Sequence, residues 1–320
     1  MKAAALKLDK MLIRREFWEN RSLWIVPVAV AGVLTVLSLY MLVAVLIGHN
    51  QTVNNVDLSN GTHFQLDNLP DFSDADDDAV SMFVRIATFS LGFIFNLLMQ
   101  VVVFFYLLDS LYAERRDRSA LFWRSMPVSD LRTVLSKLGT ALISVTAITF
   151  VVTVAFQLVL LVLFMIMGSV VGTHPWVLLT HPGSFLGAWL LLAFGLIVQA
   201  IWYLPFYGWY MLASSWAKKV PFLWAILVPV GVMFAEAWVF HTGHFARMLV
   251  AYKLRWLHLV FNLGSWDMHD LKHVDLSAGP IVTFSNLGDF ITSPSLWIGL
   301  AVAAAFVYGA IWLRGKRSEI

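Results

Sequence analysis

The chain has 320 residues, of which 59% are hydrophobic and 13% are charged, and its net charge is +2. Its mean hydropathy is +0.76. A soluble domain of this size needs more polar residues to cover its surface, so the composition excludes a soluble protein and indicates an integral membrane protein. The chain has no cysteine, which excludes disulfides, thiolate nucleophiles and thiolate metal ligands.

The N-terminal region, 1–22, is charged and amphipathic, and we expect it to form a cytoplasmic interfacial helix that is clearest from Leu8 to Asn20. The apolar run that follows is longer than the roughly 7–15 residues of a signal-peptide core. It ends in Gly48-His49-Asn50 rather than in the small residues of a cleavage site. We therefore interpret this run as a retained first span.

Apolar segments long enough to cross a bilayer, which takes about 20 helical residues, recur along the chain. The predicted fold class is an all-α membrane protein with a single transmembrane domain over 23–320. Its six spans are predicted near 23–47, 86–108, 138–167, 184–212, 221–240 and 295–313. The third span is overlong, so we expect it to tilt or to project beyond the lipid.

The positive charges predict the orientation. Most of the 22 Lys and Arg residues lie in the tail 1–22, the loop 109–137, the turn after the fourth span and the C-terminal tail. The other side of the membrane holds Arg85, Arg247, Lys253, Arg255 and Lys272. Because cytoplasmic loops are enriched in lysine and arginine, both termini are predicted to be cytoplasmic.

The predicted outer loops are 48–85, 168–183 and 241–294. The first contains an acidic run, Asp74 to Asp78, which could hold a hard cation or be a solvated acidic loop. It lacks the glycine and the distal glutamate of a calcium loop, which favours the solvated loop.

The last outer loop is too long for a plain connector, so we expect it to have structure of its own. Apolar residues recur at helical spacing within it, at Val250, Leu254, Leu257 and Phe261. Positive residues occupy other faces of the same stretch. This pattern predicts an amphipathic helix at the outer membrane surface.

Polar side chains inside the spans are costly and call for a reason. They are Asn96, Gln100, Gln157, Gln199 and Glu236. Hydrogen bonding between helices is the simpler interpretation. The alternative is that these residues line a transport route.

Catalytic and cofactor-binding motifs are not apparent in the sequence. All 9 histidines fall in the predicted outer loops, which argues against haem ligation inside the spans. His241 and His244 have a spacing that could ligate a metal, although ordinary loop histidines are favoured. The segment from Gly309 to Lys316 has one residue too many for a phosphate-binding loop, and Arg317 stands where that loop needs Ser or Thr.

The densest patch of arginines lies in the inner loop 109–137, which contains YAERRDRSALFWRSMP from Tyr112 to Pro127. A helix is predicted over Asp109–Ser125, ended by Pro127, and Ser129 can cap a second helix that leads into the third span. An anchor on anionic lipid would explain the arginines. A protein-docking helix also explains the interleaved acids and the apolar cluster, and is favoured.

This region resembles the segment after the second span in ABC-2-type permeases, the membrane subunits of ATP-binding-cassette exporters. That family has a glutamate followed by basic residues, a leucine-rich turn, a Pro-Val-Ser sequence and a lysine entering the third span. The matching positions here are Glu114, Arg115, Arg116, Leu121, Phe122, Ser125, Pro127, Val128, Ser129 and Lys137. Asp117-Arg118 replaces the small residue usual after the basic pair. The six spans, the N-terminal amphipathic helix and the structured outer segment are also similar to the family.

The resemblance implies that the loop carries a coupling helix that touches a separate ATPase subunit. The implied coupling residues are Glu114, Arg115, Arg116, Arg118, Leu121, Phe122, Trp123, Pro127 and Ser129. It further implies two permease copies as a homodimer, two ATPase subunits that bind ATP and Mg, and export across a bacterial cytoplasmic membrane. Membrane lipid is an expected partner and nucleic acid is not. The alternatives are an intramembrane enzyme that uses outer histidines on a lipid-linked substrate, and a non-transporting assembly factor.

Overall fold

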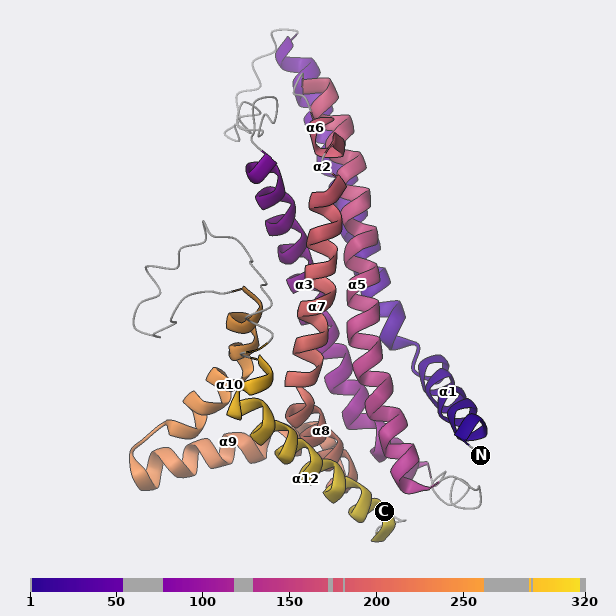
Figure 1. Cartoon of the computed structure of the whole chain (residues 1–320), viewed down its shortest axis with the longest axis vertical. Coiled ribbons are helices and arrows are strands. Elements are labelled where there is room, and N and C mark those ends of the chain that lie inside the picture. The colour runs from indigo at the N-terminus through magenta and orange to yellow at the C-terminus, as the bar shows by residue number, and fades with distance from the viewer. Residues whose placement is uncertain are drawn as a thin grey trace. The chain divides into compact units, whose positions relative to one another are not determined.

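The computed structural model describes residues 2–53, 77–117, 129–171, 175–180, 182–261, 288 and 290–316 (Figure 1). Within these ranges the regular structure is helical and there is no strand, as the sequence predicts. The helices are α1 (Lys2–Glu19), α2 (Ser22–Val53), α3 (Asp77–Arg116), α5 (Asp130–Val171), α6 (Val177–Thr180), α7 (Pro182–Trp202), α8 (Leu204–Trp216), α9 (Pro221–Phe240), α10 (His244–Phe261) and α12 (Pro294–Lys316).

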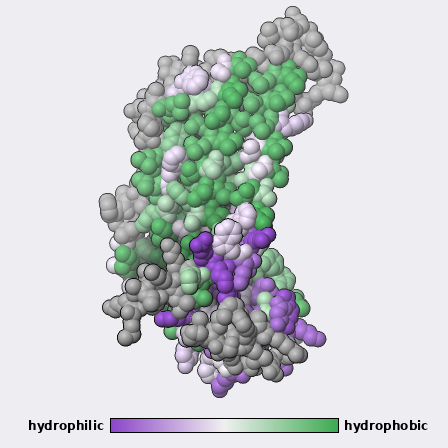
Figure 2. All heavy atoms as spheres, turned by 90° about the vertical axis from the view of Figure 1, so that its right-hand side faces the viewer, coloured by the Kyte–Doolittle hydropathy of each residue, from purple (hydrophilic) through white to green (hydrophobic). Residues whose placement is uncertain are grey.

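Six of the helices are long and apolar enough to cross a membrane, and each corresponds to a predicted span. They are α2, α3, α5, α7, α9 and α12. Large apolar side chains cover much of the visible surface in Figure 2. On α2, for example, Val33, Val36 and Tyr40 are each 67% exposed. A surface of this kind is stable in lipid and not in water, so the chain is a multi-pass membrane protein.

The helices are longer than the predicted spans. Helix α2 continues to Val53 and α3 begins at Asp77, so part of the predicted outer loop 48–85 is helical. Hydropathy predicts the part of a helix that lies in lipid, and a helix can continue beyond it. Asp77 and Asp78 lie in the first turn of α3, where acidic residues are favourable. The 42 residues of α5 extend about 63 Å at 1.5 Å per residue, which exceeds the hydrocarbon thickness of about 30 Å. The overlong third span is therefore confirmed.

The fourth predicted span, 184–212, covers two helices in the structure, and the span-capable part ends at Trp202. The chain forms α7 and α8 with a break at Tyr203. Hydrogen bonds from Tyr203 N to Gln199 O (2.9 Å) and from Tyr207 N to Tyr203 O (3.1 Å) continue across the break. Pro205 lies between them and has no N–H to donate, which interrupts the helical ladder at this point.

A helix, α10, is present where the amphipathic helix is predicted, and its outer location stays a prediction. Two aromatic residues outside the predicted apolar series make contacts here: Tyr252 stacks on Trp202 with ring centroids 4.9 Å apart, and Trp256 is buried. Trp202 Nε1 donates to the Tyr252 carbonyl at 2.7 Å. Burial raises the pKa of the Tyr252 hydroxyl to about 12. Val250 and Leu254 remain exposed, as expected of residues that face lipid.

The chain divides into two compact units, which we describe separately. One unit contains 1–24, 97–148 and 194–320, and the other contains 25–96 and 149–193. In the second unit a core forms from Val80, Val84, Met165, Leu178 and Ala188.

In the first unit α8 packs closely against α12. A Cβ placed on Gly208 would lie 3.1 Å from the Ala303 carbonyl oxygen and 3.2 Å from Phe306 Cβ. The neighbouring Trp209 ring lies 5.5 Å from the Phe306 ring, centroid to centroid. Glycine therefore lets two helix backbones approach closely, as small residues do at helix contacts in membranes.

We predict that Gly208→Leu separates α8 from α12 and lowers the free energy of unfolding by about 1–3 kcal/mol, the usual cost of overpacking. Gly231→Leu is the matched control, because a Cβ on Gly231 meets no atom within 4 Å. Thermal unfolding of the purified protein, followed by size-exclusion fluorescence, measures both. Equal melting temperatures for the two variants would contradict the close approach.

Candidate functional site: buried ion pairs at the helix ends

Three residues of the predicted coupling motif, Glu114, Arg115 and Arg116, lie in the last turn of α3 and differ in their exposure to solvent. Glu114 and Arg115 are buried, with 8% and 5% of their surface exposed. The Arg116 side chain is 54% exposed and pairs with Asp117 at 2.9 Å and Asp109 at 4.0 Å. Consecutive residues point in different directions around a helix. The motif therefore contains two buried charges and one that faces solvent.

Lys137 of α5 joins two carboxylates from other helices. Its Nζ lies 3.0 Å and 3.1 Å from the two carboxylate oxygens of Glu16 in α1. The same nitrogen lies 3.2 Å from Glu114 Oε1 in α3. The Tyr106 hydroxyl is 3.4 Å from both Glu16 Oε2 and the Lys137 carbonyl. A single lysine thus holds α1, α3 and α5 together.

Arg314 adds α12 to this arrangement. Its Nη2 donates to Glu114 Oε2 at 2.9 Å, and its Nη1 lies 3.0 Å from Asp130 Oδ1 in the first turn of α5. Glu16, Glu114, Asp130, Lys137 and Arg314 form what we call the ion-pair network. It links α1, α3, α5 and α12 through side chains far apart in sequence.

The buried Arg115 connects α3 to α8 instead. Its Nη2 donates to the carbonyls of Ser214 and Ala217, the latter at 3.0 Å. These are carbonyls at the C-terminal end of α8, where a cation is favourable. The Ser214 hydroxyl also donates to the Leu108 carbonyl at 2.6 Å and accepts from the Leu111 amide at 3.1 Å.

The electrostatics of the network make it sensitive to the loss of one partner. Of its five members, only Asp130 is partly open to solvent, at 34% of its side chain. Removing charges from water is costly, and the mutual attraction offsets this cost only while every charge keeps its partners. Breaking one buried pair typically costs about 3–5 kcal/mol, whereas an exposed pair such as Arg116–Asp117 contributes about 0–1 kcal/mol.

Three members of the network, Glu114, Asp130 and Lys137, lie in the predicted coupling loop 109–137. Helix α3 ends at Arg116 and α5 begins at Asp130, so Glu114 and Asp130 lie at the two helix ends that this loop joins. A displacement of either helix end must stretch the ion pairs to α1 and α12. The arrangement can therefore carry a movement of this segment into several helices at once.

Other predicted coupling residues, Arg118, Leu121, Phe122, Trp123 and Pro127, lie outside the described residues. Ser129 is described, and its Oγ accepts the Arg132 amide at 3.3 Å while its carbonyl accepts the Thr133 amide at 3.1 Å. The predicted N-cap of the second helix is thus present at the start of α5.

The polar span residues form hydrogen bonds within the protein. Gln157 donates to Thr88 Oγ1 at 2.7 Å and accepts from Trp189 Nε1 at 2.9 Å. Gln100 accepts from the Tyr207 hydroxyl at 3.0 Å. These bonds agree with helix-to-helix hydrogen bonding. Asn96 and Gln199 are both buried, in different units.

Glu236 acts as a cap for α10. Its Oε1 accepts from the Thr242 hydroxyl (2.8 Å) and the His244 amide (2.6 Å), and its Oε2 accepts from the Phe245 amide (2.8 Å). Two amides at the start of α10 thereby gain partners that the helix cannot supply. A transport-route role for these five polar residues stays a prediction.

His241 and His244 are the two residues predicted as weak metal candidates. His241 ends α9 with a positive φ of 53°, and His244 Nδ1 lies 3.2 Å from Arg247 Nη2. Among the residues that the structure describes, no group of three or more His, Asp and Glu side chains is placed to hold a metal ion.

Sequence reasoning missed most of the ion-pair network. Glu114 and Lys137 belong to the family motif, whereas the sequence predicts only an amphipathic helix around Glu16, a loop around Asp130 and a positive tail around Arg314. In the structure Glu16, Glu114, Asp130 and Arg314 each lie within one turn of the end of a helix, on α1, α3, α5 and α12. Sequence alone could not indicate which of these charges would meet.

No protein-family model, no curated protein and no solved structure matches this chain. The fold and the site therefore define the class directly: a multi-pass, all-helical membrane protein with six potential spans and a buried ion-pair network at the ends of four helices.

We predict that Lys137→Met destabilises the protein by about 3–5 kcal/mol, because Glu16 and Glu114 then lose a buried cation. Adding Glu16→Gln should recover part of the loss, because it removes a buried carboxylate that keeps only Arg15 at 3.4 Å as a cationic partner among the described residues. Arg116→Met, which removes an exposed positive charge, should change stability by less than about 1 kcal/mol. Thermal unfolding compares the variants, and similar losses for Lys137→Met and Arg116→Met would contradict the network.

Proposed function

We propose that this chain is the permease subunit of an ABC exporter, moving a substrate across or out of the membrane with ATP hydrolysed by a separate subunit. The observation that carries the proposal is the ion-pair network that joins both flanks of the segment 118–128 to α1 and α12. The resemblance of residues 112–137 to the coupling segment of ABC-2-type permeases supplies the partner's class. A coupling element needs rigid connections to the spans, and the network provides them.

The residues of the motif then divide into two roles. Arg116 and Asp117 are exposed and suited to contact an ATPase subunit. Glu114 and Arg115 are buried and act as positioning residues, which hold the end of α3 against α5, α8 and α12. The resemblance implies that Glu114, Arg115 and Arg116 are all coupling residues, but burial leaves Glu114 and Arg115 little surface for a direct contact with the partner.

The proposed cycle follows from this division. ATP and Mg bind to two cytoplasmic ATPase subunits, whose closure moves the coupling segments of two permease copies. Each coupling segment displaces the adjoining ends of α3 and α5. The ion pairs transmit the displacement to α1 and α12, and the helices rearrange around the substrate path. A bacterial cytoplasmic membrane and a homodimer complete the proposed assembly.

We predict that a separate soluble ATPase with a G-x-x-x-x-G-K-[ST] loop co-purifies with the full chain from its native membranes. Arg116→Glu should reduce the amount of ATPase recovered, because it reverses an exposed charge at the contact. Glu114→Gln should retain the ATPase but lose the substrate-stimulated part of ATP hydrolysis, because it weakens the connection behind the contact.

Arg247→Glu is the control for charge reversal, since Arg247 is an exposed arginine on α10, on the predicted outer side. It should leave both ATPase recovery and hydrolysis unchanged. Recovery of the chain without any such ATPase, or equal effects of Arg116→Glu and Arg247→Glu, would overturn the proposal.

A further inference from the structure

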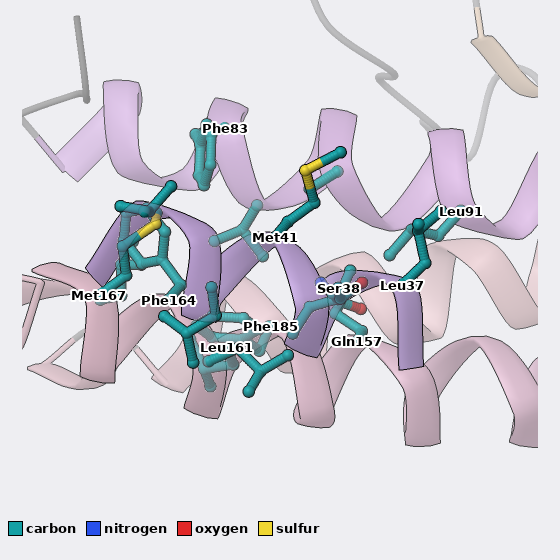
Figure 3. Close-up of a pocket in the computed structure, with 17 residues that line it drawn as sticks. Leu37, Ser38, Met41, Phe83, Leu91, Gln157, Leu161, Phe164, Met167 and Phe185 are labelled. Atoms are coloured by element: carbon teal, nitrogen blue, oxygen red, sulfur yellow. The ribbon is translucent and has the colours of Figure 1, made fainter. Parts of the chain in front are cut away.

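A cavity of about 490 Å³ lies inside the unit formed by 25–96 and 149–193. Its walls come from α2, α3, α5, α6 and α7, and they are almost entirely apolar (Figure 3). Binding pockets for small molecules commonly have volumes of about 300–1,000 Å³. The size is therefore that of a ligand site rather than of a packing defect.

The cavity is elongated along the helices. On α5 its lining runs from Gln157 to Met167, and on α3 from Phe83 to Leu91. At 1.5 Å per residue these stretches extend about 12–15 Å. Half of a hydrocarbon core of about 30 Å is about 15 Å, so the cavity has the depth of one bilayer leaflet.

The two polar side chains in the lining are already satisfied by the protein. The Gln157 amide bonds Thr88 and Trp189, and the Ser38 hydroxyl donates to the Leu34 carbonyl at 2.8 Å. Both lie at the end of the cavity nearer Leu37 and Leu91 (Figure 3). Water in such a space would find few of the two to four polar partners it needs. The cavity thus favours an occupant without hydrogen-bonding groups.

The cavity also reaches the surface that faces lipid. Leu37 and Met41 of α2 and Phe83 of α3 line it and are 51%, 50% and 39% exposed. A hydrocarbon chain can therefore enter sideways between α2 and α3 without crossing a polar layer. We propose that this cavity binds one acyl chain of a bilayer phospholipid, with its terminal methyl group toward Gln157 and Ser38.

This inference does not depend on ATP-driven transport, so it is tested with the chain alone. The purified protein is placed in vesicles of phosphatidylethanolamine and phosphatidylglycerol that contain phosphatidylethanolamine with a photoreactive diazirine on one acyl chain. Irradiation and peptide mass spectrometry then locate the cross-links. The informative positions are the lining residues Val84, Gln157 and Leu178, which are buried and which lipid around the protein cannot reach.

We expect cross-links at these buried residues without ATP or any partner. A diazirine near the end of the chain should label Gln157, and one near the ester should label the Phe83 and Met167 end. Ala87→Trp places a large side chain in the cavity and should abolish buried labelling. Ala87→Met is a milder filling variant if the tryptophan variant does not fold.

Leu190→Trp is the matched control, because Leu190 is 64% exposed on α7 and does not line the cavity. It should retain the buried cross-links. Cross-links confined to exposed residues, or buried labelling that persists at full strength in the filled variants, would overturn the proposal. A site specific for a transported lipid would fail to label with this phospholipid, which also overturns it.

Discussion

The interaction on which the first unit depends is the contact of Lys137 with Glu16 and Glu114. Away from water, a charge is tolerated only if its partners are placed around it, so each of these residues constrains the helix that carries the others. Arg314 extends the same constraint to α12 and to the start of α5. Apolar packing alone would let these helix ends slide, because lipid solvates leucine as well as a neighbouring helix does.

The second unit contains apolar contacts where the first contains buried charges. Its long helices expose large apolar side chains, and its internal polar groups bond one another, as Thr88, Gln157 and Trp189 do. Helices suit this environment because every backbone amide inside the span finds an acceptor in its own helix. Where the packing leaves a space beside these satisfied groups, the space is apolar, and that makes it suitable for hydrocarbon.

The two units therefore suit different tasks in the proposed transporter. Directional ion pairs have preferred geometries, so they can hold a helix end in one place and transmit its displacement. Apolar contacts are non-directional and permit lateral entry from lipid. The buried Glu114 and Arg115 belong to the first kind of contact, and the cavity between α2 and α5 belongs to the second.

Much of the architecture could be predicted because membrane insertion is a property of composition and length. The six spans, the helices α1 and α10, and the cap at Ser129 depend on hydropathy, periodicity and local hydrogen bonding. The break at Tyr203 also has a local cause in Pro205, although the apolar run passes through it without a change in hydropathy.

The candidate site could be predicted only in part. Sequence determined that positive charges would gather in the N-terminal tail, in the loop after the second span and in the C-terminal tail. Only the tertiary structure decided that Glu114 turns inward to Lys137 and Arg314 while Arg116 turns outward. The reason is that partners 121 and 200 residues apart meet through helix packing, and no local pattern in the chain records which faces will be opposed.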